Sequence, residues 1–341
     1  MLHVVYRSHG GENAKGRPAW YSKPLALASF LRAVESAGEP VDVVFLNDGP
    51  LAQPLLTAMS AGGRVVPITG GTNRASYLAA LKLAVRSGFD DDDVVLLAED
   101  DYLWRPDALS ALLAAAARRR ADYWAPYGTG THDDVDGRTR AERLPRTARG
   151  EARVPADVVR WVPHTSTTST FAVRVGVLRQ DHRLLVLSCM SGGDFDHTSC
   201  LAVQGVPRFG LRELVVHHPG ASTSPLVRAA RGAYLTATRS AVDLASLRRP
   251  SRRRRLAAAD PALCTHMEEG WLAPAPAGSP RHWEELAGPG TGTAAPLSTA
   301  LVHRFIHTVW TAVGNPAARP QVCTGAVDGP STAQNGERVA A

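Results

Sequence analysis

Three successive carboxylates, Glu99, Asp100 and Asp101, follow an apolar run from Val94 to Ala98. Like charges this close repel one another unless a cation lies among them. Carboxylate oxygens suit Mg²⁺ or Mn²⁺, which proteins commonly hold with one or two carboxylates while water and substrate phosphate complete the shell. This acidic triplet therefore predicts a site for Mn²⁺ or Mg²⁺ together with a diphosphate.

A second acidic run, Asp90 to Asp93, stands before the same apolar run. If residues 94–98 form a strand of an open parallel sheet, ligands bind outside its carboxyl end. The triplet lies at that end, whereas Asp90 to Asp93 lies at the opposite edge. A solvated turn is the expected role of the earlier run.

Polar residues also follow the other apolar runs of the first half. Arg7 and Ser8 follow residues 2–6, Asn47 and Asp48 follow residues 41–46, and Thr69 to Gly71 follow residues 64–68. Arg7 could meet a phosphate or make a structural ion pair, and the sequence leaves both open. All these residues are expected at one edge of the sheet.

The elements that would position these residues alternate between short apolar runs and stretches of helical period. Strands are expected at 2–6, 41–46, 64–68 and 94–98, and helices at 23–37, 51–61 and 74–87. This alternation predicts βα units, and so an α/β fold with a mostly parallel sheet flanked by helices.

The second half is less regular. Strands and connecting segments are expected over 161–189, helical character over 195–205, a strand over 206–216, and helices over 225–247 and 297–313. The division we expect is residues 1–127, a flexible loop at 128–152, a second half of the same domain at 153–222, a helical C-terminal extension at 223–314 and a disordered tail at 315–341.

The run from Val94 to Asp107 resembles the metal-binding segment of GT-A glycosyltransferases, in which a strand ends in an acidic triplet. Phe45 to Gly49 and Gly70 to Ala80 are similar to segments of family-2-like members. Gly192 to Gly205 looks like their acidic motif at an acceptor-side helix. The resemblance covers about residues 1–220, and it implies a GT-A (Rossmann-like) fold. This sequence departs from the pattern at Asn47 and Gly193.

The resemblance also implies roles for individual residues. Asp101, with His217 or His218, would hold Mn²⁺ or Mg²⁺. Asp194 would be the general base toward the acceptor hydroxyl in an inverting transfer, with Asp196 in reserve; the residues alone equally allow both to cap a helix. A nucleotide diphosphosugar donor would be bound by Arg7, Asn47, Asp48, Asn73, Arg74, Glu99 and Asp100. The segment with Trp161, His164 and Thr165 to Thr170 would hold the acceptor or the donor sugar, or form an ordinary strand.

Composition excludes several classes of protein. The chain has 341 residues, of which 44% are hydrophobic, enough for a sizeable core. No long uncharged apolar run or secretory signal pattern is present, so we expect a cytoplasmic protein without a transmembrane segment. The four cysteines form no CxxC pair. The net charge of +6 is concentrated in Arg118 to Arg120 and Arg248 to Arg255, without interleaved aromatics, and no nucleic-acid partner is expected.

Two other functions remain open. A sugar-nucleotide nucleotidyltransferase would use a similar sheet and metal-bound carboxylate, and His9 to Arg17 has the composition of its Gly-rich signature without the spacing. A non-enzymatic protein could bind polyanions through Arg248 to Arg255.

Overall fold

An eight-stranded sheet forms the centre of the computed structural model, which describes residues 1–11, 15–127, 159–215, 224–248, 253–274 and 281–288. The strand order is β3-β2-β1-β4-β8-β6-β9-β7, and β10 and β5 form a separate pair. The strands are β1 (Leu2–His9), β2 (Val41–Asp48), β3 (Arg64–Ile68), β4 (Val94–Glu99), β5 (Tyr102–Trp104), β6 (Tyr123–Ala125), β7 (Arg160–Pro163), β8 (Phe171–Arg174), β9 (Leu256–Asp260) and β10 (Cys264–His266).

The first half of the sheet is parallel. β1 lies between β2 and β4, with Leu2 opposite Val41 on one side and Val94 on the other. Because both faces of these strands are covered, their apolar runs are continuous and buried. The mostly parallel sheet confirms the α/β fold class predicted from the sequence and is consistent with a GT-A fold.

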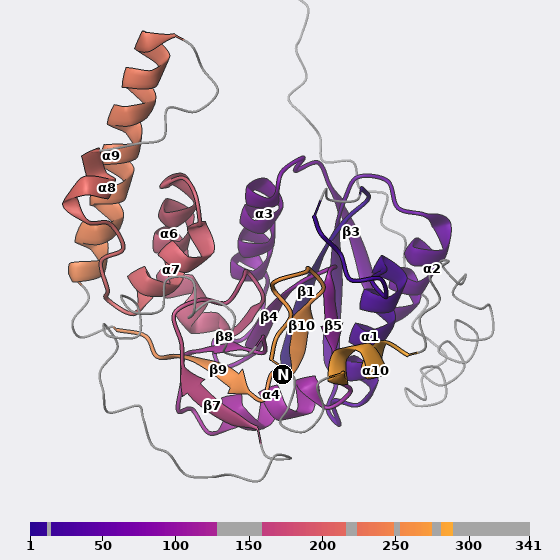
Figure 1. The fold of residues 1–341 in the computed structure, drawn as a ribbon. Helices are drawn as coiled ribbons and strands as arrows, with labels where there is room; N and C mark the ends of the chain where they lie inside the picture. The colour runs from indigo at the N-terminus through magenta and orange to yellow at the C-terminus, as the bar shows by residue number, and fades with distance from the viewer. Residues whose placement is uncertain (12–14, 128–158, 216–223, 249–252, 275–280, 289–341) are drawn as a thin grey trace, which may run out of the picture.

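Helices cover both faces of the sheet (Figure 1). Successive strand residues point to opposite faces. Val4 belongs to the core cluster that includes residues of α1 and α4, and Val5 belongs to the cluster that includes residues of α3 and α6. The helices are α1 (Lys23–Glu35), α2 (Gln53–Gly62), α3 (Asn73–Arg86), α4 (Ala108–Ala117), α6 (Val175–Met190), α7 (Phe195–Val203), α8 (Leu211–Val215), α9 (Pro225–Leu247) and α10 (His282–Ala287). No helix within the described ranges is both long and apolar enough to cross a membrane.

Local sequence signals explain where α1 and α3 begin. The Ser22 hydroxyl accepts the N–H of Leu25 at the start of α1, and the Thr72 hydroxyl accepts the N–H of Ala75 at the start of α3. Both are N-cap residues, which satisfy backbone donors that the first turn leaves open.

The second half differs from the sequence prediction in three places. Residues 175–190 form one helix, α6, where strands and connections were expected, because residues at helical spacing such as Val175, Leu178 and Leu185 are buried together. Residues 211–215 form the short helix α8 within the segment expected to be a strand.

The third difference concerns the expected helical extension at 223–314. It is helical over α9, but β9 then enters the central sheet between β6 and β7, and β10 pairs with β5. The apolar residues from Leu256 to Ala259 are buried, which explains why this segment returns to the sheet. The expected loop at 128–152, helix at 297–313 and tail at 315–341 lie outside the described residues.

Candidate functional site

A cavity of about 700 Å³ lies at the carboxyl ends of β1 and β4. The acidic triplet forms one wall. Ser166, Thr168 and Ser169 from the segment before β8 line the cavity, as does Asp194 at the start of α7. His266 and Glu268 come from β10 and the residues after it. The cavity therefore joins parts of the chain that are far apart in sequence.

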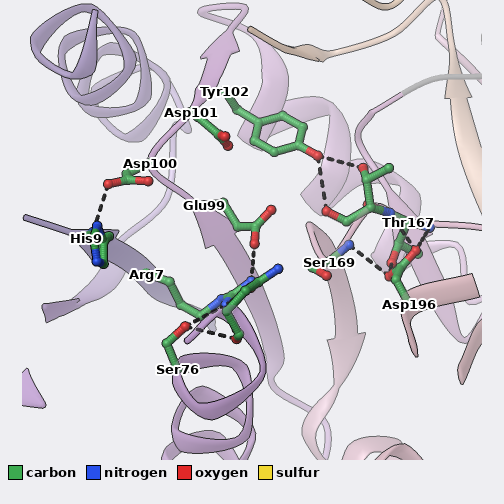
Figure 2. Close-up of polar contacts among 12 residues, drawn as sticks. Arg7, His9, Ser76, Glu99, Asp100, Asp101, Tyr102, Thr167, Ser169 and Asp196 are labelled. Carbon is green, nitrogen blue, oxygen red and sulfur yellow. Dashed lines mark hydrogen bonds and ion pairs between the residues drawn. The ribbon is translucent and has the colours of Figure 1, made fainter. Parts of the chain in front are cut away.

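Each carboxylate of the triplet faces a different basic side chain. Glu99 pairs with the Arg7 guanidinium, Asp100 with Lys23 at 3.1 Å, and Asp101 with Arg17 at 3.1 Å. The His9 N–H also donates to Asp100 at 2.9 Å, and Figure 2 shows Glu99 directed toward Arg7 and Asp100 toward His9. The repulsion that the sequence predicted is thus offset by cations from the first 23 residues.

Burial and charge act differently on the three acids. Burial raises the pKa of Glu99 to about 7 despite the opposing charge of Arg7, and burial likewise raises the pKa of Asp100. Burial also acts to raise the pKa of Asp101, but the hydrogen bond and charge of His266 outweigh it and hold that pKa well below its usual range. Asp101 is therefore the member of the triplet whose pKa is lowered.

His266, a side chain of a metal-ligand type, contacts Asp101. β10 pairs antiparallel with β5, which places His266 opposite Tyr102, with their rings stacked 5.1 Å apart. His266 Nε2 lies 2.9 Å from Asp101 Oδ2. The sequence analysis missed this residue because it lies in the part of the chain without a resemblance. His217 and His218, which the resemblance suggested, lie outside the described residues.

No group of three or more His, Cys, Asp or Glu side chains is preformed to hold a metal ion within the described part of the chain. Asp101 Oδ1 is nevertheless buried without a hydrogen-bond partner in that part, beside His266. Mg²⁺ and Mn²⁺ often take one or two protein ligands and complete their shell with phosphate and water. Asp101 Oδ1 is therefore the atom through which this site would hold such an ion.

The residues at the ends of β1 and β2 mainly hold the cavity edge together. Asp48 Oδ1 and Oδ2 accept the N–H groups of Gly70 and Gly71, each at 2.9 Å. Asn47 accepts the Ser8 hydroxyl and donates to the Gly49 carbonyl. Asp48 lines the cavity, whereas Asn47 does not.

Arg7 is buried and makes the structural ion pair that the sequence left open. It donates to Asn73 Oδ1 at 2.9 Å and to the Ser76 hydroxyl at 3.0 Å, in addition to Glu99. Arg7 and Asn73 both line the cavity, but Arg74 is exposed and is not among the lining residues.

The two candidate bases have different environments. Asp194 caps α7 by accepting the N–H of His197 at 3.3 Å, and it lines the cavity. Asp196 is buried and accepts five hydrogen bonds from residues 166–169, shown in part in Figure 2. Its oxygens are occupied in holding this segment, which argues against a role for Asp196 as a base.

Asp196 holds residues 166–169 in an uncommon shape. Thr168 and Ser169 have φ values of 49° and 62°, in the left-handed region that favours glycine. The Tyr102 hydroxyl donates to Thr168 Oγ1 at 2.6 Å, which links this segment to the strand after the triplet. Such backbone conformations persist only where the surrounding structure holds them.

Other predicted residues lie away from the cavity. Trp161 is in β7 and His164 is buried, and neither lines the cavity. In the basic run, Arg254 pairs with Asp181 at 2.8 Å and Arg255 with Asp122 at 3.8 Å. These arginines have structural partners, which disfavours a dedicated polyanion surface there.

No protein-family profile and no curated protein matches the sequence. Solved structures that are similar include S. aureus TarS in complex with UDP-GlcNAc, with a TM-score of 0.35 and 15% identity over 59% of this chain and 52% of TarS 1-349. The galactosyltransferase LgtC with donor and acceptor sugar analogues has a TM-score of 0.37 and 14% identity over 86% of this chain and 98% of LgtC.

A third similar structure is 4-diphosphocytidyl-2C-methyl-D-erythritol synthase from Anaerococcus prevotii, with a TM-score of 0.31 and 12% identity over 69% of this chain and 96% of the synthase. This chain spans about half the length of the TarS 1-349 structures that it matches. Likenesses at these TM-scores carry no assignment of activity or substrate.

Fold and site together therefore define the class: an α/β protein with a polar cavity at the carboxyl edge of its parallel strands. Acidic, basic and hydroxyl groups share that cavity. The chemistry it supports follows from these groups.

Proposed function

We propose that this protein is a glycosyltransferase that moves a sugar from a nucleotide diphosphosugar to an acceptor hydroxyl with help from Mn²⁺ or Mg²⁺. The observation that carries the proposal is the meeting of Asp101, His266 and Asp194 around one cavity. A carboxylate–imidazole pair suits the diphosphate end of such a donor, and a second carboxylate suits the acceptor end.

At the donor end, Asp101 and His266 would hold the divalent ion. When bound, the ion neutralises charge on the departing diphosphate. Arg7 and Lys15 also line the cavity and add positive charge there. Asp48, Asn73, Glu99 and Asp100 line the same side, where we place the nucleotide.

At the acceptor end, Asp194 would accept the proton of the attacking hydroxyl, and the transfer would invert configuration. The side chains of Ser166, Thr168 and Ser169 face the same cavity. Hydroxyl groups both donate and accept hydrogen bonds, which suits them to a sugar.

Thermal unfolding with and without UDP, GDP and Mn²⁺ tests the donor site, because a ligand that binds only the folded state raises the melting temperature. We expect a nucleoside diphosphate to stabilise the protein with Mn²⁺ and much less with EDTA. Asp101→Asn and His266→Ala should each remove the Mn²⁺-dependent part of the shift.

Asp92→Asn is the matched control, since Asp92 is an exposed acid beyond the other end of the same strand, paired with Arg119. It should leave the nucleotide shift unchanged. An equal shift in EDTA, or in Asp101→Asn, would show that the metal assignment is wrong.

A nucleotidyltransferase is the second candidate, because Lys15 and Arg17, from the run that suggested it, lie beside the site. Lys15 pairs with Glu268 at 2.7 Å and Arg17 with Asp101. Product analysis separates the two functions: a glycosyltransferase releases a nucleoside diphosphate, whereas a nucleotidyltransferase releases pyrophosphate from a nucleoside triphosphate.

A further inference from the structure

Two residues with side chains occupy left-handed backbone positions at the wall of the cavity. The φ values of Thr168 and Ser169 are 49° and 62°, and apart from Arg119 the other described residues with a positive φ are glycines. Glycine adopts this conformation without steric cost, whereas a residue with a Cβ does not. A side chain kept at such a position therefore has to be explained by what it contacts.

The three hydroxyl groups that precede Ser169 already donate within the protein. Ser166 Oγ and Thr167 Oγ1 donate to the Asp196 carboxylate, at 2.8 and 2.6 Å. Thr168 Oγ1 donates to the Thr167 carbonyl oxygen at 2.7 Å and also accepts a hydrogen bond from a tyrosine hydroxyl. The contacts of Thr168 thus explain why a side chain is kept at the first of the two left-handed positions.

The Ser169 hydroxyl makes no such contact within the described part of the chain. The Ser169 N–H donates to Asp196 Oδ1 at 2.8 Å, but this bond holds the backbone and does not involve the side chain. Ser169 is only 5% exposed, and it lines the cavity. Because a buried hydroxyl left unpaired costs free energy, this group is suited to a hydrogen bond with a ligand in the cavity.

The sheet places Ser169 at the centre of the site. β8 runs antiparallel to β4, with Phe171 opposite Leu97, so the residues just before β8 lie at the carboxyl end of β4. Figure 2 shows Ser169 between Glu99 on one side and Asp196 on the other. Ser169 therefore lies between the acidic triplet and the start of α7.

We propose that the Ser169 hydroxyl forms a hydrogen bond with a hydroxyl group of the transferred sugar, which makes Ser169 a specificity-determining residue for the donor. The inference rests on the proposed function, in which the diphosphate lies at Asp101 and the attacking acceptor at Asp194. The sugar that passes from one to the other has to lie between them, beside Ser169. A site built to bond a substrate hydroxyl discriminates against sugars that lack it in the right place.

Calorimetric titration in the presence of Mn²⁺ tests the inference, with UDP, UDP-glucose, UDP-galactose, UDP-GlcNAc, GDP and GDP-mannose as probes. Ser169→Ala removes the hydroxyl and keeps a Cβ at the left-handed position, whereas Ser169→Gly removes both. For the nucleotide sugar that the unchanged chain binds most tightly, both variants should weaken binding by roughly three- to ten-fold, as expected for one hydrogen bond. Binding of the nucleoside diphosphate alone should change by less than about two-fold, because it lacks the sugar.

Ser110→Ala is the matched control. It removes a serine hydroxyl that donates to the Asp107 carbonyl oxygen at the start of α4, and Ser110 does not line the cavity. This variant should leave the affinities for the nucleoside diphosphate and the nucleotide sugar unchanged. Circular dichroism should be the same for all three variants, and Ser169→Gly should unfold at or above the melting temperature of Ser169→Ala, because glycine adopts a positive φ without steric cost.

Three results would overturn the inference and leave the proposed function standing. The first is unchanged affinity for every nucleotide sugar in both Ser169 variants. The second is equal weakening for a nucleoside diphosphate and its sugars, since the contact would then not be with the sugar. The third is weaker binding in Ser169→Ala that Ser169→Gly restores, since the backbone would then set the affinity. If the unchanged chain binds none of the probes, the donor site itself is wrong, and this inference fails with it.

Discussion

Two aspartates at the start of α7, separated by a single residue, have different tasks. Both line the cavity. Asp194 caps the helix, while Asp196 accepts five hydrogen bonds that hold residues 166–169 in shape. Removing the buried carboxylate of Asp196 would leave the backbone N–H groups that donate to it unsatisfied, which costs about 1–3 kcal/mol for each group. The difference between the two residues is therefore measurable.

The first prediction at the residue scale concerns Asp194. Asp194→Asn should keep the donor affinity and cut the transfer rate by about 10²- to 10⁴-fold, because it removes a general base and leaves the donor end intact. Steady-state kinetics with the nucleotide-sugar donor measures this. Full activity in Asp194→Asn would exclude the inverting mechanism with this base.

The paired prediction concerns Asp196. Asp196→Asn should lower the free energy of unfolding by about 2 kcal/mol or more, since the amide nitrogen faces donors instead of accepting from them. It should also raise KM more than it lowers kcat, because the cavity wall loses its shape. Asp181→Asn is a control for buried acids, as Asp181 pairs with Arg254 away from the cavity; it should reduce stability without changing KM. If Asp196→Asn loses kcat alone, Asp196 is itself the base.

At the scale of elements, the loop between β3 and α3 depends on a side chain from β2. Asp48 accepts the N–H groups of Gly70 and Gly71, and Gly71 has a φ of 69°. A Cβ on Gly70 would lie 2.7 Å from Asp48 Oδ2, which is too close. Glycine is therefore required at position 70 because Asp48 approaches the backbone closely, and it is favoured at position 71 because φ is positive there.

This geometry predicts the effect of changing the loop. Asp48→Ala and Gly70→Ala should both raise the dissociation constant of the donor more than they lower the maximal rate, because both displace the cavity edge where we place the nucleotide. Calorimetric titration with a nucleoside diphosphate and Mn²⁺ measures the change. Gly88→Ala is the control, since a Cβ there meets nothing within 4 Å. Unchanged donor affinity in Asp48→Ala would show that Asp48 only forms a turn.

At the scale of the whole molecule, the segment after α9 completes the fold as well as the site. β9 lies inside the central sheet, and β10 brings His266 to Asp101 across 165 positions of sequence. Segments from both halves of the chain therefore share one core, and residues 256–266 are part of that core and not a peripheral extension.

Two leucines on either side of residues 249–252 test this continuity. Leu256 in β9 is 2% exposed and Leu247 at the end of α9 is 57% exposed. Leu256→Ala should lower the free energy of unfolding by about 2–4 kcal/mol, whereas Leu247→Ala should change it by less than about 0.5 kcal/mol. Urea unfolding measures both. Similar small effects would mean that β9 contributes little to the core.

Local pattern alone was sufficient for the first four strands and the helices that connect them. The strands at β1 to β4, the helices α1 and α3, and the place of the acidic triplet at a strand end all follow from apolar periodicity, caps and turn residues within a few positions. The polar strand ends could be expected to meet because parallel strands end at the same edge.

Only the tertiary structure decided which side chains complete the site. The acidic triplet pairs with Arg7, Arg17 and Lys23, and His266 contacts Asp101. Asp196 holds residues 166–169 through its hydrogen bonds. These interactions join residues that share no local sequence pattern. α6 and β9 were also missed, because a short apolar run fits a buried strand or a buried helix equally well. Packing against distant segments determines which forms, and that information lies in the whole chain rather than in any one stretch of it.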